Sequence, residues 1–196
     1  MRTVWGYDVE NALCPIVTEL EFNTITNQAY AGNPKVATAL AAASQAIRNY
    51  CGWHIVPSIE CTAYPVGGGI ITRLPAGYVS AVESVTVGSH ILTSDDYLWR
   101  RDGLLKRAFP YVWGDGWASI EVTYIAGYDA EAVPDLAETV CAIAAGVLSV
   151  AAGVVSESAD GVSISYSANA SSIAASLTSS LKHSLEPYRL VGAHAT

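Results

Sequence analysis

The residues best suited to chemistry are Cys51, His54 and Cys61, a Cys-x-x-His pair followed by another cysteine. Thiolates and imidazoles at such a spacing can bind zinc, but a structural zinc site gathers about four ligands and usually draws on a second Cys or His pair. This sequence has no such second pair. We therefore expect these residues to pack at a helix end and in a strand, and we expect no bound metal and no cofactor.

Catalytic patterns are equally incomplete. A nucleophile needs a base and an orienting group, and none of the four histidines lies in a Gly-x-Ser-x-Gly or His-Glu-x-x-His motif. Gly67–Gly69 could bind a phosphate through backbone amides, but a phosphate-binding loop leads into a helix. Ile70–Thr72 has the pattern of an extended strand instead, so we predict a hairpin turn. Asp95 and Asp96 could be paired acids, but their setting between two β runs is typical of a turn. The sequence does not predict an enzyme.

Four of the ten basic residues flank an Asp-Gly pair. They are Arg100, Arg101, Lys106 and Arg107. Such a hairpin could contact DNA or an acidic partner. It could equally be a solvated hairpin whose charges discourage pairing at a sheet edge. Both interpretations remain open at this point.

Composition narrows the function classes. The 196 residues carry a net charge of −8, and only 14% are charged, against roughly 25% in a typical soluble domain. We expect protein partners to cover part of this surface. A pI near 4.8 argues against a broad basic face that grips nucleic-acid phosphates. Four scattered cysteines and no secretory signal pattern indicate reduced thiols and a cytoplasmic origin.

Helical periodicity predicts three helices. Asn33 suits an N-cap and Gly52 a left-handed stop, which places the first helix at Pro34–Cys51. The others are expected over Pro134–Ala152 and Ser171–Leu185. The uncharged stretch Thr139–Ser156 approaches the length of a membrane span, but its small residues and acidic flanks favour a helix buried between protein surfaces. Nearer the start, Asp8 could cap a short helix that Pro15 would interrupt.

Runs rich in Val, Ile, Thr and Tyr predict a β region between the first two helices and a short strand after the second. Asp102-Gly103 predicts a two-residue hairpin turn in which both residues have positive φ. The expected strands are Ile59–Tyr64, Ile70–Leu74, Val79–Val87, Tyr97–Arg101, Leu104–Arg107, Ser119–Ile125 and Gly161–Ser167. This order predicts an α+β fold with a helical bundle scaffold, an inserted β module and an extended C-terminal arm.

The predicted domain bounds follow from these elements. Residues 1–32 form an N-terminal segment, residues 33–58 and 126–186 a helical core, residues 59–125 the inserted β module, and residues 187–196 a C-terminal tail.

Several pieces of the sequence, taken in order, carry a family resemblance. They are Ala39–Trp53, Arg101–Arg107, Val122–Tyr128 followed by the Pro-led helix at Val133–Leu136, then Ser156–Ser158, Val162–Ser167 and Leu185–Arg189. Over about Pro34 to Arg189 the chain resembles the head-to-tail connector (adaptor) proteins of long-tailed double-stranded DNA phages. The Val-Thr-Tyr-x-Ala-Gly-Tyr piece is the most specific part of the resemblance.

The resemblance implies a structural virion protein of the neck, assembled in the host cytoplasm. Such a protein forms a ring, expected to be a dodecamer, beneath the portal and extends the DNA channel towards a head-closure or tail protein. Double-stranded DNA would pass through without sequence-specific binding, and no membrane is involved. The acidic balance agrees with a channel in which DNA slides without sticking. Ring subunits meet through heterologous contacts, two different faces on each copy.

Two sets of residues are candidates for these contacts. The small-residue helix and the first helix suggest subunit contacts through Leu40, Ile47, Val140, Ala144, Ala145 and Leu148. The tail is expected to dock on the portal through Pro187, Tyr188, Arg189, Leu190 and Val191. Two alternatives stay open: another neck component, such as a head-closure or tail-terminator protein, and a small cytoplasmic enzyme with an unrecognised site.

Overall fold

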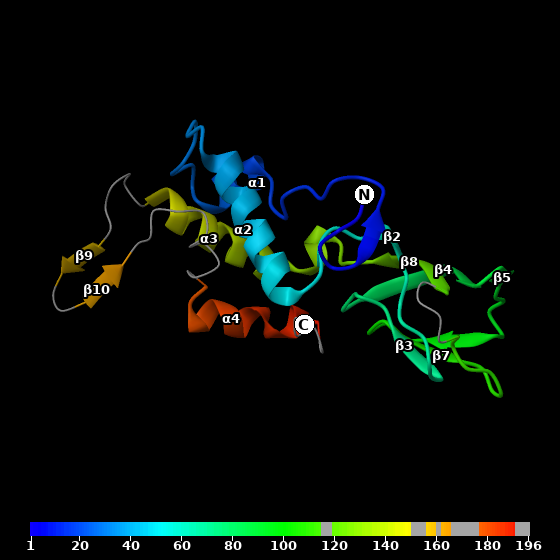
Figure 1. The fold of residues 1–196 in the computed structure, drawn as a ribbon. Coiled ribbons are helices and arrows are strands. Elements are labelled where there is room, and N and C mark those ends of the chain that lie inside the picture. Colours follow the sequence, from blue (N-terminus) through cyan, green and yellow to red (C-terminus); the bar gives the residue numbers. More distant parts are fainter. Residues whose placement is uncertain (115–118, 150–155, 160–161, 166–176, 191–196) are drawn as a thin grey trace. The chain divides into compact units, whose positions relative to one another are not determined.

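The computed structural model describes residues 1–114, 119–149, 156–159, 162–165 and 177–190. The described chain forms two compact units, labelled by element in Figure 1. The β unit contains residues 1–13, 51–132 and 188–190, and the helical unit contains residues 14–50 and 133–187, in each case within the described ranges. The fold is α+β, as predicted. The two units divide the N-terminal segment between them, since residues 1–13 belong to the β unit and residues 14–32 to the helical unit.

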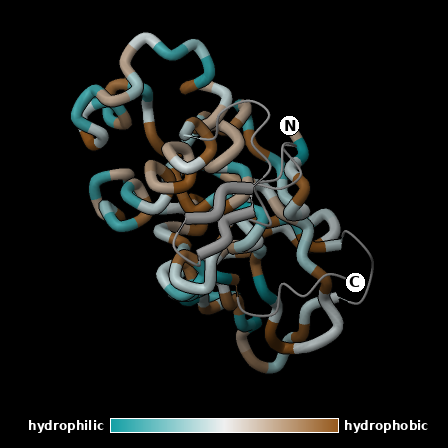
Figure 2. The backbone as a smooth tube through the Cα atoms, turned by 90° about the vertical axis from the view of Figure 1, so that its left-hand side faces the viewer, coloured by the Kyte–Doolittle hydropathy of each residue, from teal (hydrophilic) through white to brown (hydrophobic). Residues whose placement is uncertain are grey.

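The helical unit contains four α-helices among its described residues. They are α1 (Glu19–Ile25), α2 (Val36–Cys51, which ends at the first residue of the β unit), α3 (Pro134–Ser149) and α4 (Ser179–Leu185), followed by a 3-10 turn at Glu186–Tyr188. Two short strands, β9 (Ser156–Ala159) and β10 (Val162–Ser165), pair as an antiparallel hairpin. Hydrophobic and hydrophilic stretches alternate along the backbone of the chain (Figure 2).

Apolar side chains at helical spacing explain why these helices pack. The buried set includes Phe22, Val36, Leu40, Ala43, Ile47, Leu136, Val140, Ile143 and Ala144. Buried polar groups on α2 anchor the segment that precedes α1: Ser44 Oγ accepts the Ile16 amide at 2.9 Å, and Arg48 Nη2 donates to the Cys14 carbonyl at 2.8 Å. These bonds satisfy backbone groups in a segment that belongs to no helix or strand.

The predicted helices are confirmed with changes at their ends. The first begins at Val36, with Asn33 Oδ1 accepting the Lys35 amide at 3.0 Å, and Gly52 has the expected positive φ of 81°. The second begins at Pro134 as predicted, and residues 150–152 of the prediction lie outside the described residues. Residues 171–176 of the last predicted helix lie outside the described residues. Its extension through Leu177 and Thr178 is wrong, because Thr178 is the N-cap and accepts from the Leu181 amide.

The N-terminal prediction is also wrong. Asp8 caps no helix but lies in strand β1 (Tyr7–Val9), because pairing with a distant strand determines the conformation there. The helix near the start is α1 instead. Thr18 and Glu21 form its capping box, with a Thr18 Oγ1 to Glu21 amide distance of 3.3 Å. This Thr-x-x-Glu signal is visible in the sequence.

The β unit contains two antiparallel sheets. The larger has the strand order β1-β2-β8-β4-β5, from β1 and the strands β2 (Ile59–Ala63), β8 (Ile120–Ala126), β4 (Val79–Val87) and β5 (His90–Ile91). The smaller has the order β3-β7-β6, from β3 (Ile71–Arg73), β7 (Leu104–Arg107) and β6 (Tyr97–Trp99). Period-2 alternation gives each sheet one buried face. Its residues include Tyr7, Cys61, Val85, Val122 and Tyr124 in the larger sheet and Thr72 and Leu105 in the smaller.

Two turn predictions in this unit are wrong. Gly67–Gly69 does not join neighbouring strands, because β2 and β3 lie in different sheets, and the segment instead pairs with Trp113. A Cβ on Gly67 would lie 1.7 Å from the Gly114 carbonyl oxygen, so close backbone approach requires glycine there. In the β6–β7 turn only Gly103 has positive φ. The Gly103 amide donates to the Arg100 carbonyl, which makes a three-residue turn.

Candidate functional site

The Cys-x-x-His group lies inside the β unit, where His54 is fully buried. Its Nε2 is 3.0 Å from the Ala126 carbonyl oxygen, so Nε2 carries the proton and Nδ1 accepts from the Tyr7 hydroxyl at 2.8 Å. The His54 backbone amide donates to the same hydroxyl at 3.0 Å. Both ring nitrogens therefore serve structural hydrogen bonds, and neither is directed at a ligand.

Two of the buried cysteines are also unsuited to chemistry. Burial, and then the neighbouring Glu60 carboxylate, raise the pKa of Cys61 to about 12. Burial, followed by the charges of Glu21 and Glu138, raises the pKa of Cys141 to about 11. A thiol in such an environment stays protonated at neutral pH and is neither a nucleophile nor a metal ligand. Within the described residues, no three His, Cys, Asp or Glu side chains are grouped closely enough to hold a metal ion.

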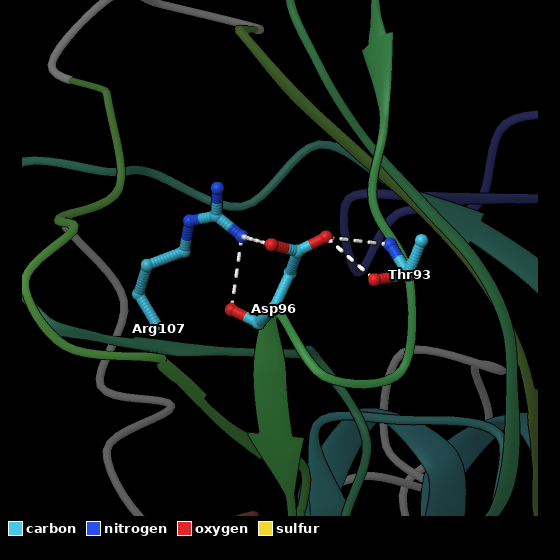
Figure 3. A network of polar contacts seen from close by, with 3 residues as sticks. All are labelled: Thr93, Asp96 and Arg107. Atoms are coloured by element: carbon cyan, nitrogen blue, oxygen red, sulfur yellow. Dashed lines mark hydrogen bonds and ion pairs between the residues drawn. The ribbon is translucent and has the colours of Figure 1, made fainter.

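Asp96 orders the turn that leads into β6 (Figure 3). Its Oδ2 accepts the Thr93 amide at 2.8 Å and the Thr93 hydroxyl at 2.9 Å, and Arg107 donates to the Asp96 carbonyl at 2.9 Å. The two bonds from Thr93, assisted by the Arg107 charge, lower the pKa of Asp96. The Asp95-Asp96 pair is thus part of a turn, as predicted.

The structure separates the four basic residues that are adjacent in sequence. Arg100 and Lys106 are exposed on the outward side of the smaller sheet. Arg101 lies over the Tyr78 ring at 6.0 Å. Arg107 lies over the Tyr111 and Trp113 rings at 5.3 and 5.7 Å, on the opposite side of β7 from Lys106. The four side chains do not form one basic surface.

Strand pairing adds a cation that the sequence interpretation missed. Arg73 of β3 lies opposite Leu104 of β7 and is exposed, and Arg100 pairs with the same leucine through its amide. Because β3 is about thirty residues away along the chain, only the register shows that Arg73, Arg100 and Lys106 share one side of the sheet. Asp102 in the turn lies 2.9 Å from Arg100.

The expected subunit-contact residues divide into two groups. Leu40, Ile47, Val140 and Ala144 are buried within the chain, where they pack the helical unit. Ala145 and Leu148 on α3 are half-buried. The Ala145 carbonyl accepts a bond from the Tyr30 hydroxyl at 3.3 Å. Of the predicted set, these last two keep surface that a neighbouring chain can reach.

The described part of the expected docking tail is held by its own β unit. The Trp53 Nε1–H donates to the Tyr188 carbonyl at 2.6 Å, and the Leu190 amide donates to the Cys51 carbonyl at 2.8 Å. The Tyr188 and Tyr128 rings meet edge to face, with centroids 6.0 Å apart. Tyr188, Arg189 and Leu190 are half-buried, Pro187 is exposed, and Val191 lies outside the described residues.

Comparison with solved structures finds matches over nearly the whole chain. The fold is similar to that of chains in the necks of GTA particles. One match is a chain in the neck of a native GTA particle computed with C12 symmetry, with a TM-score of 0.61, 15% identity, and coverage of 97% of this chain and 98% of that chain. Another is a chain in the neck of an empty GTA particle computed with C6 symmetry, with a TM-score of 0.60, 16% identity and the same coverage. No protein-family model and no curated protein matches the sequence.

Both matches cover 97% of this chain, so the likeness includes residues of both units. Among the residues that the structure describes, no helix is long and apolar enough to cross a membrane.

Proposed function

We propose that this protein is a structural component of the neck of a tailed, phage-like particle, and specifically the head-to-tail adaptor that forms a ring under the portal. The observation that carries the proposal is the end-to-end likeness to neck chains, in particles computed with C12 and C6 symmetry. The sequence resemblance to phage adaptors supports the same role, independently of the fold comparison. A dodecameric ring is the assembly that both support.

The composition agrees with this role. The net charge of −8 opposes tight binding to phosphates, which suits a ring through which double-stranded DNA moves without sequence-specific contact. A surface with few charges suits a subunit that has neighbours on several sides. Such a protein works in the virion, after assembly in the host cytoplasm.

The assignment of contacts is refined by burial. Ala145 and Leu148 are the members of the proposed subunit interface that can touch a neighbour, and the buried Leu40, Ile47, Val140 and Ala144 support the helices from within. For the portal, we propose that the docking part of the tail follows Leu190, because Tyr188 and Leu190 are hydrogen-bonded within their own unit. The downstream partner in this arrangement is a head-closure or tail protein.

The enzyme alternative lacks support in the geometry. His54, the histidine nearest two cysteines in sequence, uses both ring nitrogens in structural bonds, and burial keeps the Cys61 thiol protonated. A structural role is therefore the proposal that the described residues favour. Another neck component remains the competing role within the same class, and it predicts a different position along the neck.

The test combines a gene deletion with electron microscopy of the particles. The coding sequence is deleted from the particle-producing locus, and the products are examined by negative-stain electron microscopy. We expect filled heads and separate tails that fail to join, with joining restored by the wild-type chain supplied in trans. A chain truncated after Leu190 should fold but fail to restore joining. Normal particles from the deletion strain would overturn the proposed function.

A further inference from the structure

The outward side of the smaller sheet is both basic and apolar. In β6, β7 and β3, the register places Leu98, Lys106 and Ile71 in one row, and Leu104 lies between Arg100 and Arg73 in the row that shares this side. Leu98 and Ile71 are 68% and 54% exposed. These six residues are called the basic face. Its three cations outnumber the neighbouring Asp102 carboxylate, so the basic face is net positive.

The outward side of the larger sheet has the opposite charge. Asp8 lies opposite Thr62, Glu60 opposite Ile125, and Glu121 opposite Thr86, so all three carboxylates lie on the side away from the buried core. Ile91 of β5 shares the row of Glu121 and is 77% exposed. Asp8, Glu60, Ile91, Glu121 and Ile125 are called the acidic face.

One basic residue adjoins the acidic face. Arg2 forms an isolated bridge with Asp8, which places it beside β1. The three carboxylates outnumber this one arginine, so the acidic face is net negative, opposite in sign to the basic face.

A closed ring of identical subunits needs two different surfaces on each copy that complement one another. The β unit carries such a pair, since each face combines net charge of one sign with aliphatic side chains exposed to water. A phosphate backbone would satisfy the cations of the basic face but not its leucines and isoleucine, whereas a protein surface with isoleucines and carboxylates would satisfy both.

We propose that the basic face of one copy docks on the acidic face of the next copy, as one heterologous contact of the ring. This inference rests on the proposed function and specifies which surfaces the ring uses. Charge complementarity fixes the direction of the contact, because basic faces repel one another and acidic faces do the same. The subunits therefore join head to tail.

Two charge-reversal variants test the contact. Arg73→Glu with Lys106→Glu makes the basic face acidic, and Glu60→Lys with Glu121→Lys makes the acidic face basic. All four residues are exposed, so folding should be retained, which circular dichroism checks. The control is Lys35→Glu with Lys182→Glu, which changes the net charge as much as the first variant at exposed positions of the helical unit, outside both faces. Self-association is measured by sedimentation velocity and native mass spectrometry at low salt.

Each face variant alone should associate about tenfold or more weakly than the wild type, and the control should associate like the wild type. Mixing the two face variants should restore assembly with alternating copies, since every contact then joins opposite charges. The quadruple variant should also assemble. Face variants that assemble normally, a mixture that stays dissociated, or a wild-type chain that self-associates neither alone nor on the portal would each overturn the contact.

These outcomes are separate from the test of the proposed function. If the wild-type chain is needed to join heads to tails but the face variants still assemble normally, the neck role stands and only this contact is overturned. Loss of DNA or portal binding in the basic-face variant, with rings unchanged, would assign the basic face to that other occupant and overturn the inference.

Discussion

Replacing Tyr7 with phenylalanine removes one buried hydroxyl group and keeps the ring. That hydroxyl accepts the His54 amide N–H at 3.0 Å and donates to His54 Nδ1 at 2.8 Å, and the two residues are 1% and 0% exposed. A buried polar group that loses its hydrogen bond costs about 1–3 kcal/mol. Because the backbone amide and Nδ1 of His54 both lose their hydrogen-bond partner, we expect the free energy of unfolding to fall by about 2–4 kcal/mol.

The matched control is Tyr124→Phe. Tyr124 is equally buried, in β8 of the same sheet, but its hydroxyl has no hydrogen-bond partner among the described residues. Removing a buried, unsatisfied hydroxyl should leave stability unchanged or raise it slightly. The same chemical change is thus expected to have different effects at two buried positions that differ in hydrogen bonding.

Urea unfolding followed by tryptophan fluorescence measures both effects. The described tryptophans, Trp5, Trp53, Trp99 and Trp113, all belong to the β unit, so their signal reports on the unit that contains both tyrosines. Equal losses in the two variants, or a loss below about 0.5 kcal/mol for Tyr7→Phe, would refute the role given to the Tyr7–His54 bonds.

Three further predictions concern other parts of the molecule. Leu136→Ala, at a fully buried position in α3, should lower the free energy of unfolding by about 2–5 kcal/mol in urea titrations followed by far-ultraviolet circular dichroism, and an unchanged midpoint would contradict its place in the core. Asp96 has a lowered pKa, so its carboxylate stabilises the folded chain above the ordinary aspartate pKa, and this contribution is lost as pH falls through the folded-state pKa. The difference in the free energy of unfolding between wild type and Asp96→Asn should therefore shrink on acidification. A difference that widens would contradict the assignment. Iodoacetamide at neutral pH should modify the exposed Cys14 well before Cys61, whose pKa is about 12, as read by peptide mass spectrometry, and equal rates would contradict the burial.

Local signals predicted the regular elements well. Strands β4 and β7 have the predicted bounds, because alternation and flanking Gly, Pro and Asp residues determine short antiparallel strands locally. The two long helices follow from apolar periodicity, with α3 beginning at the predicted Pro134. The capping box of α1 was an available signal that the sequence interpretation did not use.

Long-range pairing could not be predicted from local pattern. Strand β1 has only three residues, and it forms because β2, some fifty residues later, offers an edge for Tyr7–Val9. The cations near the Asp-Gly turn were identified, but not which of them share a side, since that depends on the twist and register of the hairpin. Arg73 joins Arg100 and Lys106 only through the pairing of β3 with β7. The candidate contacts were therefore predicted as residue types, and the structure groups them into faces.

We propose that the chain is a ring-forming neck subunit. The most direct measurement is the native mass of the purified protein, alone and with the portal protein of the same particle. We expect an assembly of twelve copies, in keeping with the C12 symmetry of the similar neck, formed either alone or on the portal. A monomer whose mass is unchanged by the portal would contradict it.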